Sequence, residues 1–360
     1  MQPGSVAVVF GTRPEVVKLA PVLWALGDTA RTIHSGQHSD PALAEALLAE
    51  LGLEPPARQL HVGGAPRGTQ LGEATTLLDR EFEASAPDVV VVQGDTNTTV
   101  AAALAANARN IPLVHVEAGL RSYDRAMPEE HNRVVTDHLA DLCCAPTETS
   151  RAQLAAEGIA GRRVVVTGNT VVDAARHMLP DAPERARLLA RFGLAPNGFV
   201  LSTFHRPENV DDGVALTTIL GELGRLPRPV LLPLHPRTAV RLEQSGADTG
   251  SVRVVEPLGY RDFLGLAREC AFLVSDSGGV QEEASIVKRP VLVVRASTER
   301  PEVIGTFAEL VAPGPAIGAR GRAWSDDVAA VHARLAEIPS PYGDGDAGAR
   351  TAAAITDLLA

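Results

Sequence analysis

Cysteine, lysine and aromatic side chains are all scarce in this chain of 360 residues. Cys143, Cys144 and Cys270 are the only cysteines, Lys18 and Lys288 are the only lysines, and aromatic residues make up 4% of the chain. An odd number of cysteines, two of them adjacent and none in a CxxC pair, argues against a disulfide framework and against a zinc site. We therefore expect three reduced, buried thiols, as in a protein of the cytoplasm.

Long apolar runs and a positive net charge are missing as well. No run approaches the roughly 18 residues of a membrane span, and Met1–Ser5 lacks the basic and apolar regions of a signal peptide. The formal net charge is −11, which disfavours nucleic acid or a membrane surface as a partner. An anionic small molecule can still bind where arginines and helix N-termini gather.

The short apolar runs of the first half predict a parallel sheet. Most of them are continuous rather than alternating, which is typical of strands buried on both faces. The predicted strands are Val6–Phe10, Thr32–His34, Val89–Gln93, Leu113–Val116, Leu142–Ala145 and Val164–Thr167. The predicted helices between them are Glu15–Leu26, Ala42–Leu51 and Thr98–Asn107. This alternation predicts an α/β fold with helices on both faces of the sheet.

The same alternation restarts after a proline-rich stretch, residues 168–196, which predicts a second domain. Its predicted strands are Phe199–Thr203, Val230–Leu234, Val252–Val255, Phe272–Ser275 and Val291–Val294. Its predicted helices are Val214–Leu226, Tyr260–Arg268 and Val280–Ile286. We therefore predict two Rossmann-like domains with parallel sheets, residues 1–170 plus 346–360 and residues 171–345. The helix predicted over Ala349–Leu359 can pack back onto the first domain.

The tripeptide Arg-Pro-Glu occurs at 13–15, 206–208 and 300–302. Proline suits the first position of a helix and glutamate its first turn, so each copy predicts a helix start. At the first copy, Arg13 and Lys18 add two cations to a helix N-terminus, an arrangement that favours an anion. The pattern is neither GxGxxG nor a P-loop, so NAD and ATP are poorly supported. An ordinary turn with surface cations is the alternative.

Acidic side chains follow two predicted strands of the first half. Asp95 lies in Gln-Gly-Asp-Thr-Asn-Thr-Thr after one strand, and Glu117 lies in His-Val-Glu-Ala-Gly-Leu-Arg after another. Ligands of open α/β sheets bind at such strand ends. We expect Asp95, Glu117 and Glu129, which opens the next helix, to converge on one crevice. Crowded, partly buried carboxyls can supply both a base and an acid. Helix capping is the alternative for Asp95, and Glu130 is expected on a solvated helix face.

The second half contains a pattern that suits a pyrophosphate. In Ser-Asp-Ser-Gly-Gly, residues 275–279, a strand leads into a helix through glycines that let backbone N–H groups approach phosphate closely. Glu283, one helical turn later, can accept hydrogen bonds from two ribose hydroxyls. His205 and His235 each end a predicted strand, and functional and structural roles remain open for both. No metal is expected, because His131 lacks a ligand partner at helical spacing.

Six motifs occur in one order along nearly the whole chain. They are GTRPExxK, QGDTxTT, HVEAGLRS followed by PEExNR, HRPEN, SDSGGxQEE and TERPE. Together they resemble the non-hydrolysing UDP-N-acetylglucosamine 2-epimerases. The resemblance implies a GT-B-like fold with an interdomain cleft, usually a homodimer, in the bacterial cytoplasm. It also implies a reaction without NAD or metal: a base removes the C2 proton, UDP leaves C1, and UDP then adds back to the 2-acetamidoglucal while C2 is reprotonated on the opposite face.

The resemblance also implies a role for each motif residue. Asp95, Glu117 and Glu129 would be the acid/base carboxylates, and His205 would assist near the diphosphate. Arg13, Lys18 and Arg133 would balance charge around the leaving group and the carboxylates, and His235 would line the cleft. Phe263 would lie against the uracil and Glu283 would bind the ribose. The phosphates would be bound by Ser277, Gly278 and Gly279.

The chain departs from the family pattern at one regulatory site. Many bacterial members bind a second UDP-N-acetylglucosamine as an activator, through Arg and Gln donors that are partly missing here. The counterparts are Gln37-His38-Ser39-Asp40, Thr69-Gln70 and His205-Arg206-Pro207. We therefore expect weak or no activation. The alternatives are a hydrolysing epimerase that releases N-acetylmannosamine and UDP, a GT-B glycosyltransferase, and a non-catalytic UDP-sugar sensor. Three acidic residues argue against the transferase, which needs a single base.

Overall fold

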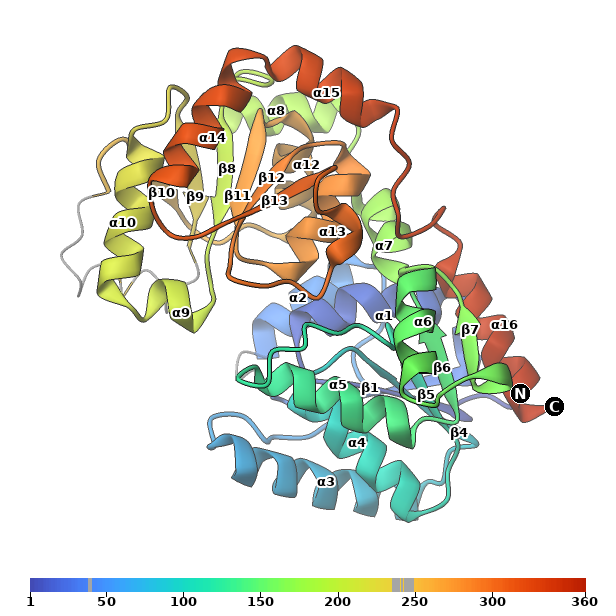
Figure 1. The fold of residues 1–360 in the computed structure, drawn as a ribbon. Helices are drawn as coiled ribbons and strands as arrows, with labels where there is room; N and C mark the ends of the chain where they lie inside the picture. Colours follow the sequence, from blue (N-terminus) through green and yellow to red (C-terminus); the bar gives the residue numbers. More distant parts are fainter. Residues whose placement is uncertain (38–40, 235–239, 241, 243–248) are drawn as a thin grey trace. The chain divides into compact units, whose positions relative to one another are not determined.

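The computed structural model describes residues 1–37, 41–234, 240, 242 and 249–360. It confirms the predicted α/β class: these residues form one parallel sheet of seven strands and one of six, each flanked by helices (Figure 1). Contacts divide the chain into a first unit, Met1–Arg176 with Tyr342–Ala360, and a second unit, His177–Pro341. The sequence-based boundaries lie a few residues away, at 170 and 346.

The sheet of the first unit has the strand order β3-β2-β1-β4-β5-β6-β7, and its paired strands are parallel. The strands are β1 (Val6–Phe10), β2 (Ala30–His34), β3 (Arg58–Gln59), β4 (Val89–Gln93), β5 (Leu113–Val116), β6 (Leu142–Ala145) and β7 (Val164–Val166). Every residue of β1, β4, β5 and β6 is buried. These strands are the continuous apolar runs of the sequence, as expected for a sheet covered on both faces.

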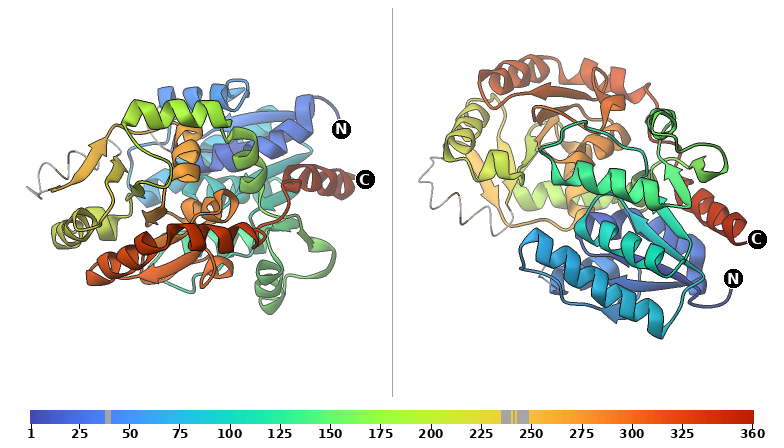
Figure 2. Two further views of the ribbon diagram at one scale, coloured as in Figure 1. Left: turned by 90° about the horizontal axis from the view of Figure 1, so that it is seen from above. Right: turned by 60° about the horizontal axis from the view of Figure 1, so that its bottom comes forward.

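Helices cover both faces of this sheet (Figures 1 and 2). They are α1 (Arg13–Leu26), α2 (Pro41–Glu50), α3 (Arg67–Ala84), α4 (Asn97–Ala108), α5 (Pro128–Leu139), α6 (Glu148–Ala156) and α16 (Ala347–Leu359). Helix α7 (Thr170–Met178) spans the boundary between the two units. The alanine-rich α4 is buried among α3, α5 and strands of the sheet. Small side chains therefore let these layers approach closely, and the core lies between them.

The C-terminal helix returns to the first unit, as the sequence predicts. Helix α16 packs against α1, and the two termini lie near each other in all three views (Figures 1 and 2). Gly348 lies so close to α1 that an added Cβ would come within 2.5 Å of the Pro21 carbonyl oxygen. Tyr342 and Ile355 are fully buried, so this last segment is part of the first unit's core.

The second unit has the strand order β10-β9-β8-β11-β12-β13. Its strands are β8 (Val200–Thr203), β9 (Val230–Pro233), β10 (Val252–Val255), β11 (Phe272–Ser275), β12 (Val291–Val294) and β13 (Ala308–Val311). Its helices are α8 (Ala182–Phe192), α9 (Pro207–Val210), α10 (Gly213–Gly224), α12 (Tyr260–Glu269), α13 (Gly278–Val287), α14 (Pro315–Asp326) and α15 (Val328–Ala336). The five strands predicted in this half are all present, whereas β13 is not predicted by the sequence.

Each Arg-Pro-Glu tripeptide opens a helix, which confirms that prediction. The first tripeptide begins α1. In the second, Arg206 is the N-cap of α9 and Pro207 is its first residue, and in the third, Arg300 is the N-cap of a 3-10 helix, Pro301–Val303. In all three the proline occupies one of the first two helical positions, where the missing N–H costs no hydrogen bond. An arginine is thereby left at each helix start.

The three cysteines are buried and unpaired, which confirms the predicted free thiols. Burial raises the pKa of Cys144 and of Cys270 to about 12 and also raises the pKa of Cys143. No helix among the described residues is long and apolar enough to cross a membrane.

Candidate active site

Glu117 follows β5 in a strained backbone conformation. Its φ is +66°, in the left-handed region that costs a residue with a Cβ about 1 kcal/mol or more. The side chain is buried and forms an ion pair with Lys18, and Asn169 Nδ2 donates to the same carboxylate oxygen at 2.9 Å. Lys18 is itself only 6% exposed. One of the chain's two lysines therefore neutralises a buried carboxylate, and the surface-cation alternative is wrong for Lys18.

Asp95 follows β4, the strand next to β5 in the sheet. Arg133 donates to Asp95 Oδ2 from Nε at 3.1 Å and from Nη2 at 2.7 Å. Asn132 Nδ2 donates to the Asp95 carbonyl at 2.8 Å. The cap of α4 is Thr96, whose side chain accepts from the Thr99 N–H. The helix-capping alternative for this motif is therefore met by Thr96 and not by Asp95, whose partly exposed carboxylate is held from α5.

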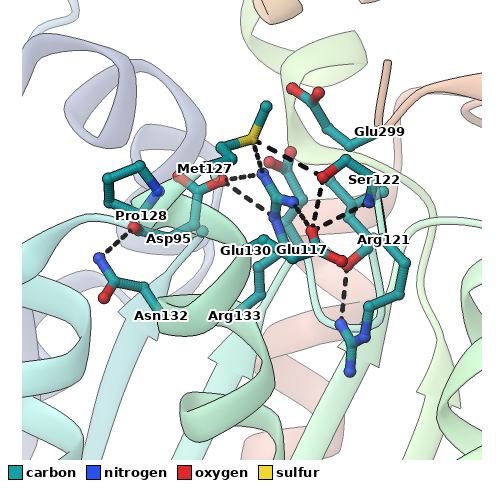
Figure 3. Close-up of polar contacts among 12 residues, drawn as sticks. Asp95, Glu117, Arg121, Ser122, Met127, Pro128, Glu130, Asn132, Arg133 and Glu299 are labelled. Carbon is teal, nitrogen blue, oxygen red and sulfur yellow. Dashed lines mark hydrogen bonds and ion pairs between the residues drawn. The ribbon is translucent and has the colours of Figure 1, made fainter. Parts of the chain in front are cut away.

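Glu130 and Glu129 lie differently from what the sequence suggests. Glu130 is 6% exposed; it forms an ion pair with Arg133 and accepts from the backbone N–H groups of Ser122 and Tyr123, each at 2.9 Å (Figure 3). The expected solvated position is wrong for Glu130. Glu129 is exposed in the first turn of α5, so Arg133 joins Asp95 to Glu130 rather than to Glu129. On a helix both Glu129 and Glu130, four and three residues before Arg133, can lie beside it. Glu130 is the one that the Ser122 and Tyr123 N–H groups hold in the buried position next to Arg133.

Glu15 is a buried carboxyl that joins the turn after β1 to the turn after β4. Its Oε2 accepts from the Gly11 N–H at 3.0 Å, and its Oε1 accepts from the Thr96 hydroxyl at 2.8 Å and the Thr99 hydroxyl at 3.3 Å. Burial raises the pKa of Glu15 to about 7, although hydrogen bonds from Gly11, Thr12, Thr96 and Thr99 act in the opposite direction. Glu15 therefore fixes the residue that follows Asp95.

Close packing explains the glycine of the first turn. An added Cβ at Gly11 would overlap the hydroxyl oxygens of Ser35 and Thr98. Arg13, two residues later, is half-buried at the start of α1. The turn is therefore tightly packed on one side and carries a cation beside it.

His205 and Asp276 form a pair in the second unit. Asp276 is fully buried after β11, and its Oδ1 lies 3.0 Å from His205 Nδ1. Its Oδ2 accepts from the Arg206 N–H and from Asn209 Nδ2, each at 3.0 Å. Burial would raise the pKa of Asp276, but hydrogen bonds and charge from His205, with the bonds from Asn209 and Arg206, outweigh it and lower this pKa. Nδ1 of the exposed His205 ring therefore faces Asp276, which leaves Nε2 for a ligand.

The Ser277-Gly278-Gly279 turn begins α13 directly after Asp276. Ser277 is the N-cap and makes no side-chain capping bond, so the first N–H groups of the helix can receive an anion. An added Cβ at Gly278 would come 2.5 Å from Arg300 Nη1, which explains the glycine. Glu283 is 7% exposed on α13, and Phe263 is half-buried in the first turn of α12. His235 lies outside the described residues.

A family model described as UDP-N-acetylglucosamine 2-epimerase matches residues 27–356. The chain belongs to the UDP-N-acetylglucosamine 2-epimerase family. It is therefore an isomerase of this family, which confirms the resemblance carried by the six motifs.

Two sequence relatives and one solved structure show how far the similarity extends. The UDP-N-acetylglucosamine 2-epimerase of Methanocaldococcus jannaschii is 36% identical over 364 residues, covering 97% of this chain and 98% of the relative. The UDP-2,3-diacetamido-2,3-dideoxy-D-glucuronate 2-epimerase of Pseudomonas aeruginosa is 34% identical over 316 residues, covering 85% and 87%. A crystal structure of the M. jannaschii enzyme with UDP-GlcNAc and UDP matches with a TM-score of 0.86 at 35% identity, covering 98% of this chain and 99% of that chain. The predicted GT-B-like fold class is thereby confirmed.

Some residues of the candidate site could be predicted from the sequence and others could not. The motifs lead to Asp95, Glu117, Lys18 and Arg133, and the structure pairs each of these two carboxylates with one of these two cations. The motifs Arg-Pro-Glu, PEExNR and SDSGG also contain Glu15, Glu130 and Asp276. These three carboxyls were not singled out, because the sequence does not show that they are buried. Among the described residues no group of three His, Cys, Asp or Glu side chains could hold a metal ion.

Proposed function

We propose that this chain reversibly converts UDP-N-acetylglucosamine into UDP-N-acetylmannosamine by inverting C2 of the sugar. The observation that carries the proposal is the pair of carboxylates, Asp95 and Glu117, at the ends of neighbouring strands of the first unit, each with its own cation. Family membership and the near full-length similarity to the M. jannaschii epimerase support the same activity.

The chemistry follows from what these groups can exchange. A carboxylate takes the C2 proton, the electrons of the C2–H bond form a C1–C2 double bond, and the C1–O bond breaks with its electron pair on UDP. UDP then adds back to C1 while a carboxyl delivers a proton to C2 on the opposite face. The base and the acid are drawn from Asp95, Glu117 and the exposed Glu129, because general acid/base catalysis needs a donor on one face of the ring and an acceptor on the other.

The second unit would hold the nucleotide that leaves and returns. The Ser277 hydroxyl and the N–H groups of Gly278 and Gly279 suit the diphosphate, whereas the Ser277 N–H donates to Ser275 Oγ at 3.0 Å. His205, oriented by Asp276, suits the leaving oxygen. Glu283 would bind the ribose hydroxyls, Phe263 would contact the uracil and His235 would contact the substrate. Arg13, Lys18 and Arg133 of the first unit would balance the charges of the diphosphate and the carboxylates.

The products formed in deuterated water test this proposal. The protein is incubated with UDP-N-acetylglucosamine and followed by proton NMR. UDP-N-acetylmannosamine carrying deuterium at C2 is the expected product. Free N-acetylmannosamine with UDP would instead establish the hydrolysing alternative, and an unchanged sugar would contradict both and leave a glycosyltransferase or a sensor. UDP-2,3-diacetamido-2,3-dideoxy-D-glucuronate, the sugar named for the P. aeruginosa relative, is the comparison substrate.

We further propose that the enzyme works as a homodimer in the bacterial cytoplasm, as the family resemblance implies. The buried free thiols are consistent with a reducing compartment. Light scattering on the purified protein should give twice the mass of the chain, and a mass of one chain would contradict the dimer.

A further inference from the structure

A chain of charged side chains, buried except for the partly exposed Glu157, reaches the turns that carry both proposed carboxylates of the first unit. Asp137 on α5 accepts from His115 Nδ1 at 2.6 Å and from Arg121 Nη1 at 2.7 Å. Arg121 in turn donates to both carboxylate oxygens of Glu157, each at 2.7 Å. His115 and Asp137 are fully buried and Arg121 is 3% exposed. We call His115, Asp137, Arg121 and Glu157 the buried network.

One end of the buried network reaches the residue before Asp95. His115 Nε2 lies 2.8 Å from the Gly94 carbonyl oxygen, which can only accept a hydrogen bond. Burial would raise the pKa of Asp137, but the charges and hydrogen bonds of His115 and Arg121 outweigh it and lower this pKa. Asp137 is therefore a carboxylate, so both ring nitrogens of His115 face hydrogen-bond acceptors, Asp137 at Nδ1 and the Gly94 carbonyl at Nε2. The His115 ring thereby links Asp137 to the Gly94 carbonyl, which lies between β4 and Asp95.

The other contact of Asp137 reaches the turn that contains Glu117. Asp137 Oδ2 accepts from the Gly119 N–H at 3.1 Å. Gly119 has φ +83°, and an added Cβ would come 2.5 Å from the Ser150 carbonyl oxygen. The strained conformation of Glu117 persists only if the surrounding structure fixes it. The Gly119 bond supplies that restraint on one side of Glu117, and the bond from the Gly94 N–H to the Val116 carbonyl, 3.0 Å, supplies it on the other.

Stability alone does not account for the buried network. Replacing a buried ion pair by apolar side chains of similar volume is often neutral or stabilising, because desolvation offsets the attraction. What apolar side chains could not supply is directed bonds to Gly94 and Gly119. The same helix also presents Arg133, one turn before Asp137, to the Asp95 carboxylate. Helix α5 therefore holds Asp95 through its carboxylate and through the preceding carbonyl.

We propose that Asp137 is a positioning residue: through His115 and Gly119 it sets where Asp95 and Glu117 stand for the reaction at C2. This inference rests on the proposed function. Asp137 itself is fully buried and has no access to substrate. Its effect should therefore fall on the chemical step and not on nucleotide binding, which the proposed function assigns to the second unit.

The first test compares Asp137→Asn with a control of similar stability loss. Leu78→Ala removes a fully buried apolar side chain of the same unit that makes none of the network's hydrogen bonds. It should lower the free energy of unfolding by about 2–5 kcal/mol, as breaking a buried charge network does. Well below the unfolding temperature, Asp137→Asn should lower kcat for C2 deuterium exchange about 10²-fold with KM and the Kd for UDP unchanged. Leu78→Ala should keep kcat. Equal kcat values in the two variants would overturn the proposal.

A second pair of variants covers the case in which Asp137→Asn does not fold. In His115→Gln the amide N–H can replace Nε2 toward Gly94, whereas in His115→Asn it can replace Nδ1 toward Asp137. The glutamine variant should keep more of the C2 exchange than the asparagine variant, and the reverse order would overturn the link to Asp95. If Asp95→Asn and Glu117→Gln both exchange at the wild-type rate, the proposed function itself fails and the positioning role with it. Loss in those two variants but not in Asp137→Asn overturns the positioning role alone.

Discussion

At the scale of single residues, two buried carboxyls of the first unit show opposite shifts in pKa. Burial raises the pKa of Glu15 to about 7, because its partners Gly11, Thr96 and Thr99 are neutral donors that do not compensate for lost hydration. Burial acts in the same direction on Asp137, but His115 and Arg121 bring positive charge and the pKa falls. The type of partner therefore decides the charge state of a buried acid.

The raised pKa of Glu15 predicts a pH-dependent stability. Because the folded-state pKa, about 7, lies above the unfolded value of about 4.5, folding binds a proton between these values. The contribution of Glu15 to the free energy of unfolding, roughly 3 kcal/mol, is therefore fully present below pH 4.5 and is lost as the pH rises through 7. Urea unfolding of the wild type and of Glu15→Gln at several pH values measures the difference. The gap between the two proteins should change over this window, and parallel pH curves would contradict the assignment.

At the scale of elements, α5 buries a charged face. Glu130, Arg133 and Asp137 follow the i, i+3, i+7 spacing that usually marks an apolar stripe, and all three are buried. A helix pattern built on apolar residues therefore predicts the wrong orientation, which is why Glu130 is expected in solvent. The spacing of the motif could not show that the charged side chains on this face form ion pairs with partners inside the unit.

The orientation of α5 predicts different effects for two neighbouring glutamates. Glu130→Gln removes a charge from the buried pair with Arg133 and a hydrogen-bond acceptor from Ser122 or Tyr123, and should lower the free energy of unfolding by about 1–3 kcal/mol. Glu129→Gln makes the same chemical change at an exposed position and should change it by less than about 0.5 kcal/mol. Thermal or urea unfolding of both variants measures the difference. Equal losses would show that α5 is rotated from the orientation described.

The strands were the most predictable elements, and the short or polar elements the least. The predicted bounds of β1, β4, β5, β6, β10, β11 and β12 coincide with the observed bounds. All of these strands except β10 are buried throughout, as continuous apolar runs predict. By contrast, β3 has two exposed residues, and half of β13 is only partly buried. Neither strand therefore has the continuous apolar run or the alternation of apolar and polar residues by which a strand is predicted from sequence. Helix α3 was missed because few of its side chains are buried.

Helix α3 also bears on regulation. Gln70 is 7% exposed; its Nε2 donates to the Val62 carbonyl at 3.3 Å, and its Oε1 accepts from Asn97 Nδ2 at 2.6 Å. Gln37 Oε1 accepts from the Thr98 N–H at 2.9 Å. These counterparts of the activator-binding residues are thus engaged within the unit. His38, Ser39 and Asp40 lie outside the described residues.

We therefore predict catalysis without activation by a second substrate molecule. The rate should depend hyperbolically on the concentration of UDP-N-acetylglucosamine, and the reverse reaction should start from pure UDP-N-acetylmannosamine without a lag. Progress curves followed by NMR or by coupled detection of the products measure this. A lag that disappears on adding a trace of UDP-N-acetylglucosamine would contradict the prediction.

At the scale of the whole molecule, each unit has its own sheet, its own core and its own set of polar groups. The acidic groups with paired cations belong to the first unit, and the glycine turn with the His205–Asp276 pair belongs to the second. The repeated strand–helix rhythm predicted this division, and the return of the last helix to the first unit was predicted as well. What the sequence could not give is which acids are buried, because that depends on partners far along the chain.

This division makes the Asp95→Asn and Glu117→Gln variants the most direct test of the account. The measurement is C2 deuterium exchange into UDP-N-acetylglucosamine, made together with the affinity for UDP. The control is Asp79→Asn, a change at a partly exposed carboxylate of the same unit that pairs with Arg109. Asp95→Asn and Glu117→Gln should exchange about 10²–10⁴-fold more slowly than the wild type while binding UDP with unchanged affinity, and Asp79→Asn should match the wild type in both. Wild-type exchange in both acidic-site variants, or a loss of UDP affinity equal to the loss of exchange, would contradict the central claim.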